Sequence, residues 1–234
     1  MDELKKGAES LGVELSDSAL GMFQKYYELL EEKNRVMNLT AISGKRDIVQ
    51  MHFLDSLCLM NVADFKNSSV IDVGTGAGFP GLPLKIAEPT ISAVLLDATQ
   101  KRVDFLKEVC DECKIDGVEC LHARAEDAAG ASNLREKFDF AVSRAVAQMN
   151  VLCELCMPFV KIGGAFVAMK STASEEELAN AQNAVITLGG CVESVHDYVI
   201  PGTEVSHRAV VVRKITETPP KYPRRYAKMT GKPL

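Results

Sequence analysis

Apolar positions in the first part of the chain, up to about residue 66, follow a helical spacing. Residues 16–38 place an apolar stripe on one face of a helix, and Ser16 stands where an N-cap is expected. The stripe consists of Leu20, Phe23, Tyr27, Leu30 and Met37. A second helix is predicted over residues 47–60. The pattern therefore predicts a helical N-terminal extension, residues 1–66.

After residue 67 the pattern changes to short apolar runs that alternate with helix-like stretches. Strands are predicted over residues 70–73, 92–96, 117–121, 138–142 and 165–169. Helices are predicted to begin near Pro80, at Gln100 and at Gln148. A capping box of Ser174 and Glu177 predicts one more helix, which ends at Gly189.

The last two predicted strands, residues 192–200 and 209–215, follow each other without a helix, so we expect an antiparallel hairpin. Alternating strands and helices predict a mostly parallel sheet with helices on both faces. A sheet closed by such a hairpin resembles the seven-stranded, Rossmann-like α/β fold of class I methyltransferases. The predicted organisation is the helical extension, a sheet domain over residues 67–216 and a basic tail over residues 217–234.

A glycine-rich loop follows the first predicted strand. Gly76, Gly78 and Gly81 satisfy the G-x-G-x-x-G spacing of nucleotide-binding loops. The loop follows a buried strand and opens a helix, and an acid, Asp97, lies about twenty residues further on. A carboxylate at that position can accept hydrogen bonds from both hydroxyls of an adenosine ribose.

Asp72 indicates which of two cofactors the loop binds, a dinucleotide or S-adenosylmethionine. It lies two positions before the first glycine, Gly74. A dinucleotide would place its pyrophosphate against this loop, where the carboxylate would repel it. S-adenosylmethionine instead carries a cationic ammonium and a cationic sulfonium. Asp72 therefore favours S-adenosylmethionine as the cofactor, and the alternative role for this acid is to cap the turn.

Two later loops also lie at the predicted carboxyl edge of the sheet, where ligands of open α/β folds bind. Ala125 and Glu126 can bracket the adenine ring, although acids at a helix N-terminus explain them nearly as well. Arg144 follows the fourth strand and can contact a base or a cofactor carboxylate, or form a structural ion pair.

The segment after the fourth strand, residues 143–147, bears neither an Asn/Asp-Pro-Pro-aromatic motif nor a cysteine nucleophile. Methylation of an exocyclic amine or of a pyrimidine carbon is therefore disfavoured. A target with its own lone pair, such as guanine N7, remains, and its methylation depends mostly on positioning.

Together these motifs resemble the glucose-inhibited division protein B family, bacterial methyltransferases that modify guanine N7 in small-subunit ribosomal RNA. The segments that carry the resemblance are residues 38–40, 52–56, 72–81, 96–97, 101–102, 143–145 and 221–224. The resemblance implies a guanine in the decoding-region loop of 16S RNA as the target. It also implies that the cofactor is contacted at Gly74, Phe79, Ala125, Glu126 and Arg144.

One departure from the family pattern is Ser171 after Lys170, where many relatives have glycine. Lys170 is retained as a candidate catalytic residue beside Arg144. His52 is open to two interpretations, a wall of an RNA cleft together with Asn38, or a core residue.

The charge of −5 is unevenly distributed, because eight Lys or Arg and one acid lie between Arg208 and the end. A basic tail on an acidic body suggests a polyanionic partner or a solvated terminus. In light of the resemblance we expect RNA contacts in the tail, at Lys221, Arg224, Arg225 and Lys228, with tyrosines 222 and 226 as stacking surfaces.

The chain shows neither a signal peptide nor an apolar run of membrane-spanning length, so we expect a cytoplasmic monomer. Its seven cysteines are an odd, scattered set, and the two Cys-x-x-Cys pairs fall in predicted helices, so we expect thiols and no metal. Three alternatives stay open for the function: a different RNA substrate, a small-molecule substrate, or a ribosome-binding module that retains the fold. The form of the RNA substrate, from naked RNA to mature subunit, is also open.

Overall fold

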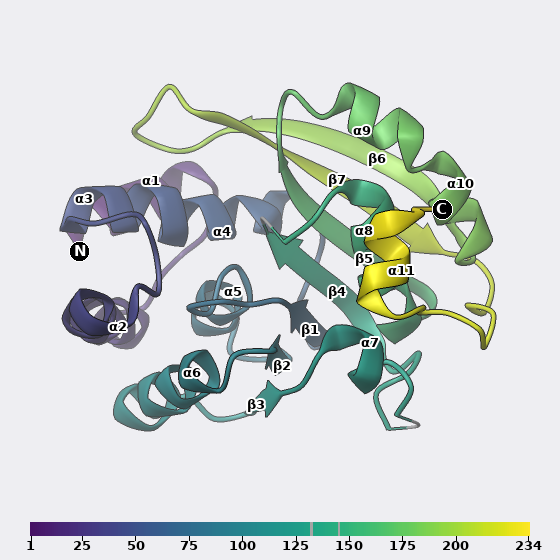
Figure 1. Ribbon diagram of the computed structural model, residues 1–234. Coiled ribbons are helices and arrows are strands. Elements are labelled where there is room, and N and C mark those ends of the chain that lie inside the picture. The colour runs from purple at the N-terminus through teal and green to yellow at the C-terminus, as the bar shows by residue number, and fades with distance from the viewer. Residues whose placement is uncertain (132, 145) are drawn as a thin grey trace.

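The computed structural model describes residues 1–131, 133–144 and 146–234, so Ala145 of the 143–145 motif lies outside the described residues. Its centre is a seven-stranded sheet with the order β3-β2-β1-β4-β5-β7-β6 (Figure 1). The strands are β1 (Ser69–Val73), β2 (Ser92–Asp97), β3 (Val118–His122), β4 (Phe138–Arg144), β5 (Val160–Ser171), β6 (Gly190–Val199) and β7 (Ser206–Lys214). Strands β1 to β5 pair in parallel, and β7 pairs antiparallel with both β5 and β6. The predicted fold class and its closing hairpin are confirmed.

Strand β5 is much longer than predicted, because it begins at Val160 instead of residue 165. The pair Gly163–Gly164 resembles a turn in the sequence, yet it lies inside the strand. A side chain at Gly164 would meet the carbonyl oxygen of Asp139 at 2.5 Å, so glycine permits the close approach of β4 at a register shift.

The N-terminal extension is helical, as predicted. It contains α1 (Asp2–Ser10), α2 (Asp17–Met37), α3 (Lys45–Ile48), a π-helical turn (Val49–Leu54), α4 (Asp55–Leu57) and a 3-10 turn (Cys58–Asn61). Ser16 caps α2 by accepting the N–H of Ala19, as predicted. The predicted second helix is interrupted by the π-helical turn, and such turns occur frequently at functional sites.

Helices cover both faces of the sheet (Figure 1). The remaining helices are α5 (Gly81–Ala87), α6 (Gln100–Cys113), α7 (Ala125–Ala128), α8 (Met149–Cys156), α9 (Glu175–Asn180), α10 (Gln182–Thr187) and α11 (Tyr226–Gly231). One hydrophobic cluster joins the N-terminal helices to the glycine loop, α5 and α6, while a second joins α8, α10 and α11 to the other face. The extension thus shares its core with the sheet.

The capping box predicted at Ser174 is wrong. The Ser174 hydroxyl caps no helix and, within the described part of the chain, is buried without a hydrogen-bond partner. The helix is divided in two at Ala181, and Glu177 accepts the N–H of Met149 instead. A tertiary contact therefore takes the glutamate that the local pattern assigns to a cap.

The two Cys-x-x-Cys pairs lie within α6 and α8, as predicted, and their thiols are buried. Among residues 1–131, 133–144 and 146–234, no three His, Cys, Asp or Glu side chains are grouped so as to hold a metal ion. The described helices also include none with the length and apolar content needed to cross a membrane.

Gly78 provides a test of how the N-terminal helices support the sheet. A methyl group there would lie 2.5 Å from the Tyr26 hydroxyl and 2.9 Å from Leu106, at a φ of +108°. We expect Gly78→Ala to lower the free energy of unfolding by about 3 kcal/mol through backbone strain and overpacking. Gly12→Ala is the control, because Gly12 also has a positive φ but nothing within 4 Å, and it should cost about 1 kcal/mol. Equal losses in urea unfolding would show that the contact with Tyr26 and Leu106 is unimportant.

Candidate active site

The glycine loop between β1 and α5 is held in place by a buried acid, Asp72. Asp72 Oδ2 accepts the Thr75 hydroxyl and the Gly81 N–H, both at 2.7 Å. The N–H groups of Gly74 and Thr75 donate to the Leu96 carbonyl, which ties the loop to β2. One carboxylate therefore joins the two ends of the loop.

Burial raises the pKa of Asp72 to about 6, against the lowering effect of its hydrogen bonds with Thr75 and Gly81. Its second oxygen, Oδ1, is buried and has no hydrogen-bond partner among the described residues. The structure therefore gives Asp72 a role in fixing the loop, and its contact with a cofactor stays a prediction.

Asp97, at the end of β2, binds the middle of the glycine loop. Its Oδ2 accepts the Gly76 N–H at 3.0 Å, and its Oδ1 accepts the Thr99 N–H at 2.8 Å. Ala125 and Glu126 are half-buried at the start of α7, directly after β3. Because β1, β2 and β3 are parallel neighbours, the predicted cofactor contacts lie at one edge of the sheet.

An aromatic stack joins the glycine loop to the N-terminal extension. The Phe79 ring lies parallel to the His52 ring at 4.3 Å and to the Tyr26 ring at 5.5 Å between centroids. The Tyr26 hydroxyl donates to the Ala77 carbonyl. The loop is therefore supported by side chains from α2 and from the π-helical turn.

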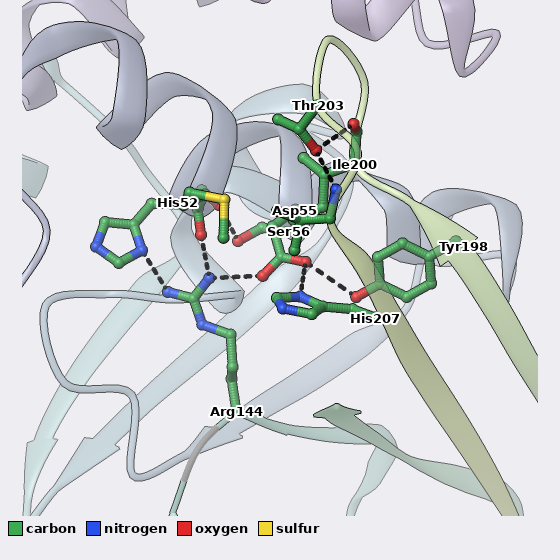
Figure 2. Close-up of polar contacts among 10 residues, drawn as sticks. His52, Asp55, Ser56, Arg144, Tyr198, Ile200, Thr203 and His207 are labelled. Carbon is green, nitrogen blue, oxygen red and sulfur yellow. Dashed lines mark hydrogen bonds and ion pairs between the residues drawn. The ribbon is translucent and has the colours of Figure 1, made fainter. Parts of the chain in front are cut away.

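Arg144, the last residue of β4, is held by three acceptors of the N-terminal extension (Figure 2). Its Nη1 donates to the Met51 carbonyl at 3.0 Å and to Asp55 Oδ2 at 2.9 Å, and its Nη2 donates to His52 Nδ1 at 2.9 Å. The guanidinium carbon lies 5.0 Å from the Phe79 ring centroid. The ion pair foreseen as one alternative for Arg144 is present.

His52 is a buried member of this network. Burial, reinforced by the charge of Arg144, lowers the pKa of His52 to about 3, so the ring is neutral. Since Nδ1 accepts from Arg144, the hydrogen lies on Nε2, 2.7 Å from the Thr40 hydroxyl. His52 is buried, as one interpretation predicts, but it also lines the cavity beside Arg144, and Asn38 is exposed.

Asp55 connects Arg144 to the closing hairpin. Its Oδ1 accepts the Tyr198 hydroxyl at 3.1 Å and His207 Nδ1 at 2.8 Å (Figure 2). The hydrogen bond with Asp55 raises the pKa of His207 above its ordinary value, against the effect of burial. The sequence pattern gave no role to these three residues, because 152 positions separate Asp55 from His207.

A cavity of about 390 Å³ opens beside this network, within the range of roughly 300–1,000 Å³ that is usual for small-ligand sites. Its lining consists of Ile42, Met51, His52, Asp55, Arg144, Met169, Lys170, Ser171, Glu177 and His207. The two catalytic candidates, Arg144 and Lys170, therefore share one cavity. Lys170 Nζ donates to the Ala147 carbonyl at 2.9 Å and pairs with Glu177 Oε1 at 2.5 Å, which holds the segment after β4.

The basic tail contains one arginine with a structural partner. The Arg224 guanidinium donates to both oxygens of Glu154, which is only 1% exposed in α8. Lys221, Arg225 and Lys228 are exposed and stay predicted RNA contacts. The expectation of Tyr222 as a stacking surface is wrong, because its ring is buried against the second hydrophobic cluster.

A comparison with protein families identifies the family of this chain. The family described as GidB, rRNA small subunit methyltransferase G, matches residues 20–205. This chain belongs to the GidB family. The match covers the N-terminal residues that hold Arg144 and six of the seven strands, β1 to β6, and it confirms the resemblance inferred from the motifs.

Relatives in the GidB family match over nearly their whole length. The ribosomal RNA small subunit methyltransferase G of Alkaliphilus oremlandii (strain OhILAs) is 47% identical, over 100% of this chain and 98% of the relative. The protein of the same name from Clostridium perfringens (strain SM101 / Type A) is 44% identical over the same shares. A solved structure of M. jannaschii TYW2 in complex with AdoMet has a TM-score of 0.57 at 14% identity, covering 75% of this chain and 80% of that chain. The last likeness concerns the fold alone.

The Arg224–Glu154 pair separates structural from exposed arginines in the tail of this GidB protein. We expect Arg224→Ala to lower the free energy of unfolding by about 3–5 kcal/mol, because Glu154 would stay buried without a counter-charge. Arg225→Ala is the neighbouring control, and it should change stability by less than about 0.5 kcal/mol. Urea unfolding followed by circular dichroism measures both. A loss below about 1 kcal/mol for Arg224→Ala, a third of the smallest expected effect, would contradict the anchoring role.

Proposed function

We propose that this protein transfers a methyl group from S-adenosylmethionine to N7 of a guanine in the decoding-region loop of 16S ribosomal RNA. The observation that carries the proposal is the match of residues 20–205 to the rRNA small subunit methyltransferase G family. The cavity beside the end of β4, lined by Arg144, supports it.

The glycine loop fits S-adenosylmethionine, which supplies an electrophilic methyl group on a sulfonium. Gly76 has a φ of +62° and nothing within 4 Å of the position of a Cβ, so the backbone is open to a ligand at this point. The carboxylates of Asp72 and Asp97 flank the loop, and acids suit a cationic ligand. Asp72 Oδ1, buried without a partner among the described residues, can satisfy its hydrogen-bonding capacity with such a ligand.

The proposed cofactor residues divide into three groups. Gly74, Gly76 and Asp97 would hold the methionine and ribose portions, while Ala125 and Glu126 would bracket the adenine. Gly78 and Phe79 would act from behind the loop, because Gly78 packs on Tyr26 and Phe79 packs on His52. Their contribution is to keep the loop in its open shape.

The cavity lined by Arg144, Lys170 and His207 would receive the target guanine. N7 carries a lone pair and no hydrogen, so the reaction requires no general base, and the protein would act by positioning. Arg144 would offer donors to a ligand. Lys170 is engaged by Glu177 and the Ala147 carbonyl, so its role would be to hold the segment that follows β4.

The test of the proposal is transfer of a labelled methyl group. The purified protein is incubated with radiolabelled S-adenosylmethionine and small ribosomal subunits from a strain that lacks the gene. We expect one labelled nucleotide in the RNA, and we expect it to be 7-methylguanine. Label in another nucleotide would overturn the assignment of N7. Cofactor binding without transfer to naked RNA, assembly intermediates or mature subunits would overturn the substrate.

The exposed tail residues predict a specific salt dependence. We expect the double variant Arg225→Ala/Lys228→Ala to bind small subunits more weakly, and to reduce the slope of log Kd against log salt concentration by about 2, because two phosphate contacts are lost. Lys5→Ala/Lys6→Ala removes the same charge from the exposed face of α1 and serves as the control. An equal reduction of the slope by both pairs would mean that only net charge matters.

A further inference from the structure

Asp55 is a fully buried acid whose two oxygens serve three segments of the chain. Oδ2 accepts Arg144 of β4, and Oδ1 accepts Tyr198 of β6 and His207 of β7. Burying a carboxylate is unfavourable, and a buried ion pair often contributes little net stability compared with apolar packing. The position of the acid therefore calls for an explanation beyond stability.

The hydrogen bonds of Arg144 indicate what Asp55 does. A guanidinium has five N–H donors. Three of them are taken by Met51, Asp55 and His52, all from the N-terminal extension. The Nε–H and one Nη2–H have no partner among the described residues, and the side chain lines the cavity. Arg144 is thus fixed by part of its donor set and keeps the rest for a ligand, a geometry that suits bidentate recognition.

His207 and Tyr198 act on Asp55 from the opposite side (Figure 2). Both side chains donate to Oδ1, which leaves Oδ2 directed at Arg144. His207 itself lines the cavity and is half-buried. The hairpin therefore limits the orientation of the Asp55 carboxylate, and the carboxylate limits the orientation of the guanidinium.

We propose that Asp55 is the positioning residue of Arg144, and that His207 and Tyr198 hold Asp55 in the orientation that directs the free N–H groups of Arg144 into the cavity. This inference rests on the proposed methyl transfer. It assigns the closing hairpin a task in the reaction, in addition to completing the sheet. No proton transfer by Asp55 or His207 is involved.

The first test compares Asp55→Asn with Arg144→Ala in the methyl-transfer assay. We expect Asp55→Asn to reduce kcat/KM by about 100-fold, because a misdirected group costs about this much. It should change the same constants as Arg144→Ala, whether kcat, KM or the Kd for S-adenosylmethionine. The double variant should be no less active than Arg144→Ala alone, since Asp55 then has nothing left to position.

The second test uses His207 of the hairpin, which is half-buried, whereas Asp55 is fully buried. His207→Ala should lower kcat/KM by about 10-fold, an intermediate value for an indirect positioning contact. His207→Asn should restore most of the activity, because its side-chain amide can donate from nearly the position of Nδ1. His196→Ala is the control: His196 is an exposed residue of β6 whose hydrogen bond is with the Ser194 hydroxyl, and its loss should leave activity unchanged.

The outcomes separate the two claims. Failure of the wild-type protein to methylate RNA would overturn the proposed function. The positioning of Arg144 would then be tested by the Kd for small ribosomal subunits, which Asp55→Asn and Arg144→Ala should raise by the same factor, and an increase with Arg144→Ala alone would overturn the inference. With an active wild-type protein, a folded His207→Ala variant at full activity would overturn the inference. So would a double variant whose loss is the product of the two single losses, because the residues would then act independently.

Discussion

The carboxylate of Asp72 lies at the turn from β1 into α5, where the residue is only 1% exposed. Its Oδ2 receives the Thr75 hydroxyl and the Gly81 N–H, so a single oxygen holds the start and the end of the glycine loop. The raised pKa of Asp72, about 6, reflects how strongly burial disfavours the charge that these donors stabilise. The contact of the loop with β2 through Gly76 and Asp97, and its stacking on the N-terminal helices, both require this turn.

The N-terminal helices are part of the site rather than an addition to the sheet. Tyr26 donates to the Ala77 carbonyl and lies where a side chain at Gly78 would have to be. Phe79 is packed between Tyr26 and His52, and His52 accepts a hydrogen bond from Arg144. A continuous series of contacts thus runs from α2 through the glycine loop to the end of β4. The match to the GidB family includes this region, consistent with a site formed by both parts of the chain.

Features that depend on the spacing of nearby residues were predictable from the sequence. The order of strands and helices, the closing hairpin and the cap at Ser16 follow from hydrophobic spacing and turn residues. The glycine loop and Asp97 were found because their spacing reflects one supersecondary unit. The start of β5 was missed because Gly163 and Gly164 resemble a turn, although they serve the close approach of Asp139.

Features that depend on tertiary contacts were not predictable. Arg224 has the same local context as Arg225, and only the position of Glu154 in α8 distinguishes them. Asp55 and His207 meet across 152 positions, which leaves no spacing signal in either segment. The sequence indicated Lys170 as a candidate catalytic residue. Its pairing with Glu177 was not predictable, because the local pattern assigns Glu177 to a capping box.

Both cations of the cavity carry a paired acid, and the proposed chemistry gives this a physical reason. Methylation at N7 leaves a positive charge on the guanine, so an uncompensated guanidinium or ammonium nearby would oppose the reaction. Asp55 lies 2.9 Å from the Arg144 guanidinium, and Glu177 lies 2.5 Å from the Lys170 ammonium. Each acid opposes the field of its cation, and Arg144 still keeps free N–H groups for a ligand. A site of this kind can orient a base with strong donors and still accept the charge that the transferred methyl group brings.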